Sequence, residues 1–470
     1  MSDYARQEHH DFQGAAGQAL HDAPLQAALI RLTDTLMTAN RRGFAALADS
    51  SQLRDHAKRI KEHVLAHLDK YLEQLEAAVQ KAGGHVYWAA NADEARQVIL
   101  DIAQRSDCQR AVKSKSMTSE EIHLNAALQA AGIEVTETDF GEYILQLAGE
   151  RPSHLVAPAV HHTRESIGQV LSKHLGKPLA DDAPSLALAG RRALREKFYH
   201  ADLGISGVNF AVAETGSIVL VTNEGNGRLT TTWPRVHIAL MGMEKVIPRL
   251  VDLPVFLKLL ARAATGQQLS VYTTIITGPR RANELDGPEE FHLVILDNGR
   301  SKILATPFRE SLQCIRCGAC LNACPVYRRI GGHAYGGVYG GPIGSILTPL
   351  YDSVTANPDL PHASSLCGAC QEACPVKINI PHMLLGLREL VHQTKPKRWE
   401  ELAYRGWKEL LRRPWLYRVA LRCARWVLWP FSKGGWLQTL PGPAGGWTAT
   451  RDFPAPAARS FRERWRELQG

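Results

Sequence analysis

The chain has 470 residues, of which 45% are hydrophobic and 22% charged, and its formal net charge is +8. This is the composition of a soluble globular protein with roughly two to four domains, and a charge of this size does not by itself indicate a nucleic-acid partner. The N-terminal sequence MSDYARQEHHDFQG lacks a signal peptide's basic and apolar regions, and no run of roughly 18 residues is both uncharged and apolar throughout, as a membrane span requires. We expect a cytoplasmic protein, with peripheral attachment to the inner membrane face left open.

Residues 24–82 are expected to be helical. The runs LQAALIRLTDTLMTANRRGFAAL and LRDHAKRIKEHVLAHLDKYLEQLEAAVQKAGG repeat apolar residues every three to four positions, and the second ends at Gly83-Gly84, a suitable C-cap. We expect residues 1–84 to form a packed helical arm rather than a functional coiled coil.

From His85 onward, short strand-like runs alternate with helical ones. HVYWAA, AVKSKS and IEVTETD are strand-like, whereas ADEARQVILDIAQR, SEEIHLNAALQAAG and YILQLAG are helical. This alternation predicts βαβ units and therefore an α/β fold with a mainly parallel sheet. Further strands are expected in NFAVAETGSIVLVTN, RVHIALMGMEKVI, LSVYTTIITGP and EFHLVILDNG. We expect one α/β domain over residues 85–300.

Seven of the nine cysteines fall in a predicted domain over residues 301–390. Cys314, Cys317, Cys320 and Cys324 form C-x2-C-x2-C-x3-C, followed by Pro325. Three thiolates at this spacing can converge on one iron–sulfur cubane, while the fourth ligates a second cluster. Zinc is the alternative, but zinc sites usually pair two C-x2-C knuckles across a longer gap. Nine cysteines are too few for a disulfide scaffold, which indicates a reducing compartment.

A second cysteine group repeats the first, since CGACQEACPV matches CGACLNACPV. Such duplicated loops hold two clusters by exchanging their last cysteine. The first cluster is expected to take Cys314, Cys317, Cys320 and Cys374, and the second Cys324, Cys367 and Cys370.

The second group lacks one thiol, because Ser364 stands where Cys314 stands in the first. The missing ligand can be the serine oxygen, a thiol from elsewhere or a partner group, or the cluster can be a [3Fe-4S] cluster. Cys108 and Cys423 are the spare thiols, and each is expected to be a small buried apolar residue.

Other polar residues near the cysteines carry weaker signals. His333 and His362 have no ligand spacing, so we expect them to be structural or exposed. Nearby basic side chains can raise a cluster's potential, although a solvated surface charge is the simpler expectation for each of them: Arg316, Arg328, Arg329 and Lys377.

The stretch ETGSIVLVTNEGNGR, residues 214–228, is the most distinctive one outside the cysteines. Its two turns can present backbone N–H groups to an anion, but without a nucleotide-binding fingerprint a pair of tight turns is favoured. Glu214 and Glu224 have no companion fixed by spacing, so no catalytic residue is assigned. No flavin or nicotinamide fingerprint is present.

These segments together resemble the lactate utilization protein B family, the iron–sulfur subunit of a bacterial L-lactate oxidation system. The resemblance runs nearly end to end, through ETGSI, NEGNGR, CIRCGACLNACPVYRRIGGHAYGGVYGGPIGSILTPL and SSLCGACQEACPVKINI. It implies two [4Fe-4S] clusters, the second held by three cysteines, and two companion proteins that help convert L-lactate to pyruvate. It also implies an α/β domain similar in fold to sugar-phosphate isomerases and coenzyme A transferases.

Residues 391–470 carry eight of the ten tryptophans and many arginines. RRPWLYRVALRCARWVLWP can pack on its own domain, dock a partner subunit or lie in a membrane interface.

We therefore expect an electron-transfer subunit that takes electrons from a 2-hydroxy-acid-oxidising companion to a further acceptor such as the quinone pool, without catalysing the oxidation itself. Two alternatives remain: a small-molecule transferase or isomerase whose clusters sense redox state, and a structural assembly subunit.

Overall fold

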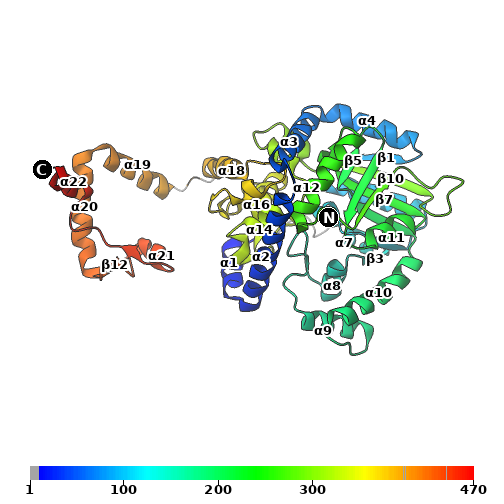
Figure 1. Ribbon diagram of the computed structural model, residues 1–470, viewed down its shortest axis with the longest axis horizontal. Helices are drawn as coiled ribbons and strands as arrows, with labels where there is room; N and C mark the ends of the chain where they lie inside the picture. The colour runs from blue at the N-terminus through cyan, green and yellow to red at the C-terminus, as the bar shows by residue number, and fades with distance from the viewer. Residues whose placement is uncertain (1–9, 395, 397, 441, 470) are drawn as a thin grey trace. The chain divides into compact units, whose positions relative to one another are not determined.

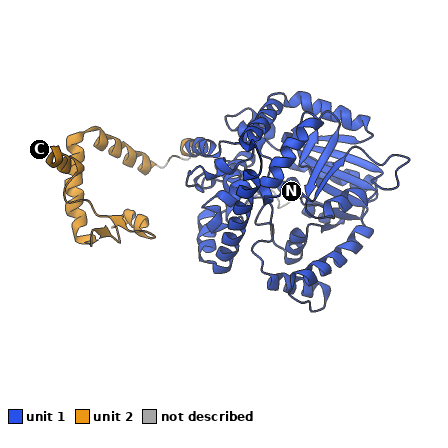
Figure 2. Ribbon diagram, viewed as in Figure 1, with its two compact units in different colours: residues 1–391 blue, residues 392–470 orange. Residues whose placement is uncertain are grey.

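The computed structural model describes residues 10–394, 396, 398–440 and 442–469. The chain forms two compact units, residues 1–391 and residues 392–470 (Figure 2). The N-terminal run in which we expect no signal peptide lies mostly outside the described residues. The four-domain division stays a prediction.

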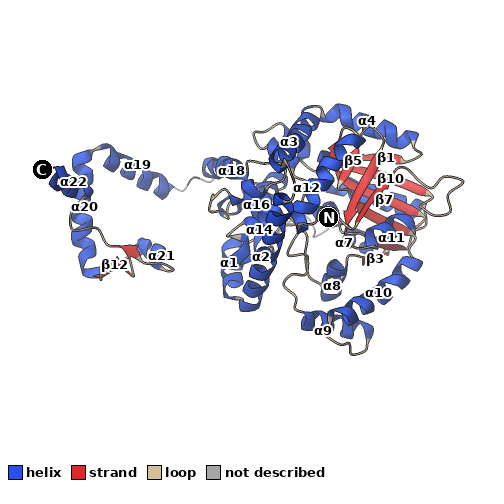
Figure 3. Ribbon diagram, viewed as in Figure 1, coloured by secondary structure: helices blue, strands red, loops and turns tan. Residues whose placement is uncertain are grey.

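A six-stranded parallel sheet forms the centre of the first unit (Figure 3). The strand order is β1-β10-β7-β4-β2-β3. The strands are β1 (His85–Ala89), β2 (Arg110–Lys113), β3 (Glu134–Glu137), β4 (Leu203–Gly207), β7 (Val236–Gly242) and β10 (Glu290–Leu296). The predicted α/β fold with a mainly parallel sheet is confirmed. Strand β4 is not among the predicted strands, because LGISG has two glycines and a short apolar pattern.

Alternate residues of the central strands pack on opposite faces of the sheet, as the pleat requires. Ile238 and Leu240 of β7 join a core with α5 (Ala92–Arg105) and α7 (Leu124–Ala130). Ala239 and Met241 join a different core with α4 (Leu68–Lys81). Because both faces are covered, β7 is buried along its whole length.

The remaining helices of this region flank the sheet (Figure 1). Val112 of β2 packs in a third core with α8 (Phe140–Ala148), α9 (Arg164–Leu175) and α10 (Ala183–Tyr199). Shorter helices complete the connections: α6 (Met117–Glu121), α11 (Asn226–Thr232) and α13 (Arg300–Leu304).

Parts of three predicted strand runs form a second sheet instead of extending the first. Its order is β8-β5-β6-β9, with β5 and β6 antiparallel. Its strands are β5 (Phe210–Val212), β6 (Ser217–Thr222), β8 (Val246–Ile247) and β9 (Tyr272–Ile276), and α12 (Leu253–Thr265) follows β8. Phe210 and Val219 share a core with α12 and with the cysteine region.

The N-terminal helices α1 (Phe12–His21), α2 (Ala23–Ala45) and α3 (Ser50–Ala66) pack on the cysteine region. Figure 1 shows α2 beside α14 (Ala319–Ala323), and it also contacts α12 and α15 (Tyr327–Ile330). The helices predicted over residues 24–82 are therefore present, and α2 and α3 brace the cysteine loops. The region also contains α16 (Gly341–Tyr351), α17 (Ala369–Ala373) and α18 (Ile380–Thr394).

The second unit consists of short helices and a small antiparallel sheet, β11-β12-β13. Its elements are α19 (Arg398–Arg412), α20 (Pro414–Leu428), β11 (Ser432–Lys433), β12 (Trp436–Leu437), α21 (Gly445–Thr448), β13 (Phe453–Pro454) and α22 (Phe461–Gln469). Helices α19, α20 and α22 bury no residue. In the described parts of both units, no helix is long and apolar enough to cross a bilayer.

Candidate iron–sulfur site

The cysteine loops bring thiols from both halves of the repeat together. Cys314, Cys317, Cys320 and Cys374 line one small cavity. Burial raises the pKa of the Cys320 thiol well above its usual value, and the negative charges of the other three thiols act in the same direction. A cation such as iron is therefore needed to hold these four groups as thiolates.

The other three cysteines form a neighbouring group. Burial raises the pKa of Cys370 to about 12, with further contributions from the charges of Cys324 and Cys367. Cys367 is the exposed member, and hydrogen bonding to the Ala369 N–H lowers the pKa of its thiol. The second group is thus the more solvent-accessible of the two.

The two loops share an unusual backbone path. Arg316 and Leu366 occupy matched positions and have φ values of +59° and +55°. Gly318 and Gly368, two residues further on, have φ values of +76° and +85°. Only glycine adopts the second conformation at low cost, which explains the repeated C-G-A-C sequence. The sequence duplication is therefore also a duplication of structure.

Ser364 occupies the structural position of the missing cysteine. The Arg316 N–H donates to Cys314 Sγ at 3.4 Å, and the Leu366 N–H donates to Ser364 Oγ at 3.1 Å in the same way. The serine side chain is therefore oriented as the cysteine of the first loop is.

Helix α3 supports the second loop. Arg54 donates through its guanidinium to the main-chain oxygens of Cys374 and Glu372, both at 2.6 Å. Lys377 pairs with Asp55 of the same helix at 2.5 Å. The helical arm therefore fixes the residue that the second repeat contributes to the first cavity.

A buried ion network lies behind the first loop. Arg316, predicted as a solvated surface charge, is instead 8% exposed, stacks on Tyr339 and lies 3.5 Å from Glu244. Glu244 also accepts from Arg300 at 2.6 Å, and Arg300 pairs with Glu121 at 2.9 Å. Burial alone would raise the pKa of Glu244, but Arg300 and Arg316 outweigh it and hold that pKa at about 2. The loop therefore carries a permanent buried positive charge.

The remaining predicted residues lie outside the thiol groups. Arg328 pairs with Asp34 and Arg329 is exposed, as expected of surface charges. The His333 Nε2–H donates to the Arg151 carbonyl oxygen at 2.8 Å, and His362 is exposed.

The spare thiols differ from each other. Cys108 is buried in the core between the sheet and α5, as predicted, and burial raises its pKa to about 11. The prediction for Cys423 is wrong, because this residue is exposed on α20. Free cysteines are usually buried, but α20 buries nothing within its unit.

The donor set fits iron–sulfur clusters better than zinc. Each group consists of cysteines from both repeats, no histidine lines the first cavity, and apolar side chains such as Leu155, Ile343 and Ile378 complete its wall. Closed apolar surroundings of this kind are typical of buried cluster sites. When bound, such clusters supply one-electron transfer.

A larger cavity, of about 480 Å³, lies beside the first loop. It is lined by the carboxyl ends of β2, β3 and β4, by the turn containing Asn223 and Glu224, and by Arg316 and Cys317. A pair of plain tight turns is the expectation for residues 214–228. The Thr215-Gly216 turn packs closely on α4, whereas the turn at Asn223 borders this cavity.

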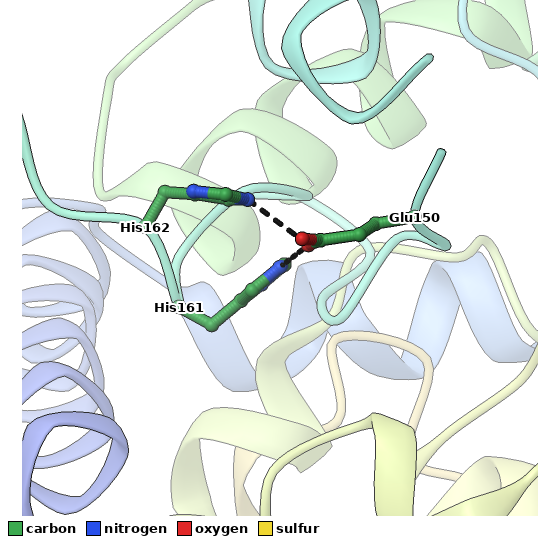
Figure 4. Close-up of side chains that lie close together, drawn as sticks. All are labelled: Glu150, His161 and His162. Atoms are coloured by element: carbon green, nitrogen blue, oxygen red, sulfur yellow. Dashed lines mark hydrogen bonds and ion pairs between the residues drawn. The ribbon is translucent and has the colours of Figure 1, made fainter. Parts of the chain in front are cut away.

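One further cluster, Glu150 with His161 and His162, was not predicted (Figure 4). Both imidazole Nε2 atoms lie against the same carboxylate oxygen of Glu150, at 2.6 Å and 3.0 Å. The three ligand atoms lie within 4.8 Å of one another, a spacing that suits a divalent metal ion. The hydrogen bonds of Glu150 to the two histidines close the loop over residues 150–162. Leu155, within this loop, lines the cavity of the first cysteine group.

Three family models match successive parts of the chain. A LUD domain matches residues 72–296, a 4Fe-4S dicluster domain matches residues 310–378, and the model "Lactate utilisation protein B, C-terminal" matches residues 385–469.

Curated relatives are similar over nearly the whole chain. Lactate utilization protein B of Shouchella clausii is 46% identical over 460 residues, 97% of each chain. The proteins of the same name from Bacillus velezensis and Bacillus licheniformis are 44% and 48% identical, covering 97% and 89% of this chain and 97% and 88% of their own. A DUF162 family protein from Deinococcus radiodurans of known crystal structure covers 49% of this chain and 98% of its own, at 14% identity and a TM-score of 0.29, which is too low to support an argument.

The resemblance drawn from the cysteine loops and the flanking segments is thereby confirmed. Because the identity extends through the α/β domain, the 4Fe-4S domain and the C-terminal region, the chain belongs to the lactate utilization protein B family.

Proposed function

We propose that this chain is the electron-transfer subunit of a system that oxidises L-lactate to pyruvate, and that it carries two [4Fe-4S] clusters. Companion proteins would oxidise the lactate, and the chain would pass the electrons to a further acceptor. The proposed ligands are Cys314, Cys317, Cys320 and Cys374 for the first cluster, and Cys324, Cys367 and Cys370 for the second.

The observation that carries the proposal is the presence of Cys374 in the cavity of the first loop. A cysteine of the second repeat there is the exchange expected of a two-cluster ferredoxin module, and a pair of separate zinc knuckles would not need it. The relatives' name connects such a module with lactate utilization.

The fourth position of the second cluster is proposed to belong to the Ser364 oxygen. Its Oγ accepts a backbone hydrogen bond just as Cys314 Sγ does. Ser364→Cys should retain two clusters and change the low-temperature EPR signal of the second one only, because the ligand changes from oxygen to sulfur. Ser364→Ala, the matched control, should shift that signal or yield a [3Fe-4S] signal; an unchanged signal in both variants would assign the ligand elsewhere.

The chain's residues set the path for the electrons. The first thiol group is closed by apolar side chains and lies next to the positive charge of Arg316, so the protein excludes water and compensates added negative charge there. The second group reaches solvent at Cys367. We infer that exchange with a partner protein takes place at the second group.

The second unit is proposed to dock the companions. Helix α20 exposes Trp415 and Trp426 together with several arginines, a composition enriched at protein interfaces. The same surface also suits binding to an inner membrane face, close to a quinone acceptor. Truncation before Arg398 should abolish copurification with companions in the first case and vesicle binding in the second.

The test of the function is anaerobic reduction by lactate. L-lactate added to the chain with its companions should bleach the visible iron–sulfur absorbance, and D-lactate serves as the control. No bleaching in an intact complex would contradict electron transfer and favour a structural assembly role. Turnover of a phosphorylated or thioester substrate by the isolated chain, surviving Cys317→Ser, would instead favour a transferase or isomerase.

A further inference from the structure

The 480 Å³ cavity beside the first cysteine loop lies where α/β proteins usually bind ligands. From β2 the chain forms β3 on one side, and it then returns to place β4 on the other side of β2. The cavity is lined by residues that directly follow β2 and β4, among them Ser114 and Val208. Crevices at the carboxyl ends of strands where the order reverses in this way are the common ligand sites of open α/β sheets.

Three cationic side chains line this cavity with unused hydrogen-bonding capacity. Lys245 is 9% exposed, and among the described residues it has neither a hydrogen bond nor a salt bridge. Arg316 is 8% exposed and its Nη1 is buried without a hydrogen-bond partner. Lys115 is 3.9 Å from Glu142, but its buried Nζ makes no hydrogen bond. Arg316 Nη1 and Lys115 Nζ are buried donors left unpaired, which is costly, so an added acceptor in the cavity would stabilise both groups.

Two of the three cationic side chains lie near each other at one end of the cavity. Lys245 and Arg316 influence each other electrostatically and both lie near Cys314. Asp139 and Glu224 line the other end, near Lys115. Such a distribution suits a ligand with one anionic group at the cysteine end and a second beside Lys115, with hydroxyl or amino groups facing Asp139 and Glu224.

The remaining wall and the volume limit the size of the ligand. Leu155, Leu260 and Ala264 provide apolar surface, which a bare inorganic ion would leave uncovered. A volume of 480 Å³ falls within the roughly 300–1,000 Å³ of sites that take organic ligands of drug size. A three-carbon acid such as lactate would fill only a small part of it.

We propose that this cavity binds an organic anion larger than lactate, whose phosphate or carboxylate group pairs with Lys245 and Arg316 beside the first cysteine loop. The inference concerns binding to the α/β domain and does not depend on the direction or the partners of electron transfer. The rival explanation is that these cations only compensate the negative charge of the cysteine loop.

The test is anaerobic calorimetry on the full-length, cluster-loaded chain, with pyrophosphate and succinate as probes. At least one probe should bind saturably with a stoichiometry of one. The tighter probe identifies the anionic group as phosphate or carboxylate. The visible absorbance is followed throughout, so that loss of iron to pyrophosphate is not counted as binding.

Two variants tie binding to this cavity. Lys245→Gln and Lys115→Gln should each weaken the binding of that probe by roughly tenfold or more, the loss expected for one charge-assisted hydrogen bond. Lys258→Gln is the matched control, because Lys258 is on α12, which also lines the cavity, but is exposed to solvent. If the Lys245→Gln variant fails to load its clusters, the Lys115→Gln variant alone shows whether the probe binds in this cavity, because Lys115 is not part of the cysteine loops.

Two results would overturn the proposal. One is the absence of saturable binding by either probe up to roughly 10 mM, which is weaker than any specific small-anion site needs. The other is binding that neither lysine variant weakens. If Lys245→Gln changes the reduction potential of the clusters while no probe binds, charge compensation is the role of this residue. Lactate-driven bleaching can succeed or fail independently of these outcomes, so the two proposals are tested separately.

Discussion

Replacing Glu244 by glutamine removes the carboxylate that joins the buried arginines behind the first cysteine loop. This carboxylate accepts from Arg300 at 2.6 Å and lies 3.5 Å from Arg316, and all three side chains are at most 8% exposed. The network holds the pKa of Glu244 at about 2, against an ordinary value of 4.5. At 1.36 kcal/mol per unit, this shift corresponds to about 3 kcal/mol of stability. Glu244→Gln should therefore lower the free energy of unfolding by about that amount, because two buried guanidinium groups lose their counter-charge.

The pH dependence follows from the direction of the shift. A carboxyl with a depressed folded-state pKa stabilises the fold fully above its unfolded value of 4.5, and the contribution is lost as pH falls toward 2. The difference between wild type and Glu244→Gln should therefore be constant between about pH 5 and pH 8. Urea unfolding followed by far-UV circular dichroism, under anaerobic conditions, measures it.

The matched control is Glu62→Gln. Glu62 pairs with Lys58 at 3.8 Å on the helix surface and is 49% exposed, so its replacement should change stability by no more than about 0.5 kcal/mol. A Glu244→Gln effect as small as that of the control, or one that varies across the neutral range, would refute the argument from the buried network.

Two further predictions concern the loops themselves. Gly318→Ala and Gly368→Ala should each cost about 1–2 kcal/mol, because both glycines have positive φ. Gly318→Ala should cost more stability, because its Cβ would lie 3.2 Å from Val156, whereas nothing lies within 4 Å of the Cβ at position 368. The rate of iron loss to a chelator compares the two variants. Arg54→Ala should destabilise the loop by about 1–3 kcal/mol, because the Cys374 carbonyl loses its charged donor and keeps only the Lys377 N–H. Faster iron loss than in the wild type is the expected sign. Equal rates for all three variants and the wild type would contradict these assignments.

The sequence predicted the elements whose signal is local. Central strands such as β7 and β10 are predominantly apolar runs, and the long helices show clear periodicity. The cysteine spacing is equally local, because a tight loop needs its ligands at fixed offsets. Strand β4 carries no such signal, since its place in the sheet depends on neighbours that are distant in sequence.

The cavity and the ion network could not be predicted from spacing. Lys115 and Lys245 are separated by 130 positions in the sequence, and only the packing of the two sheets against the cysteine loops brings them to one cavity. Arg316 was interpreted as a surface charge because nothing in its neighbours shows that Glu244 lies opposite. The exposure of Cys423 has a related cause, since the usual burial of a free cysteine needs an element that covers it, and residue type alone does not show whether one is present.

The most direct test of the two-cluster account is an iron and sulfide count combined with low-temperature EPR on the anaerobically purified chain. The account predicts about eight iron atoms per chain and, after reduction, the signal of two interacting [4Fe-4S] clusters. Cys317→Ser should disturb the first cluster, and Cys367→Ser the second. A colourless protein that holds zinc and no iron among these cysteines would contradict the account.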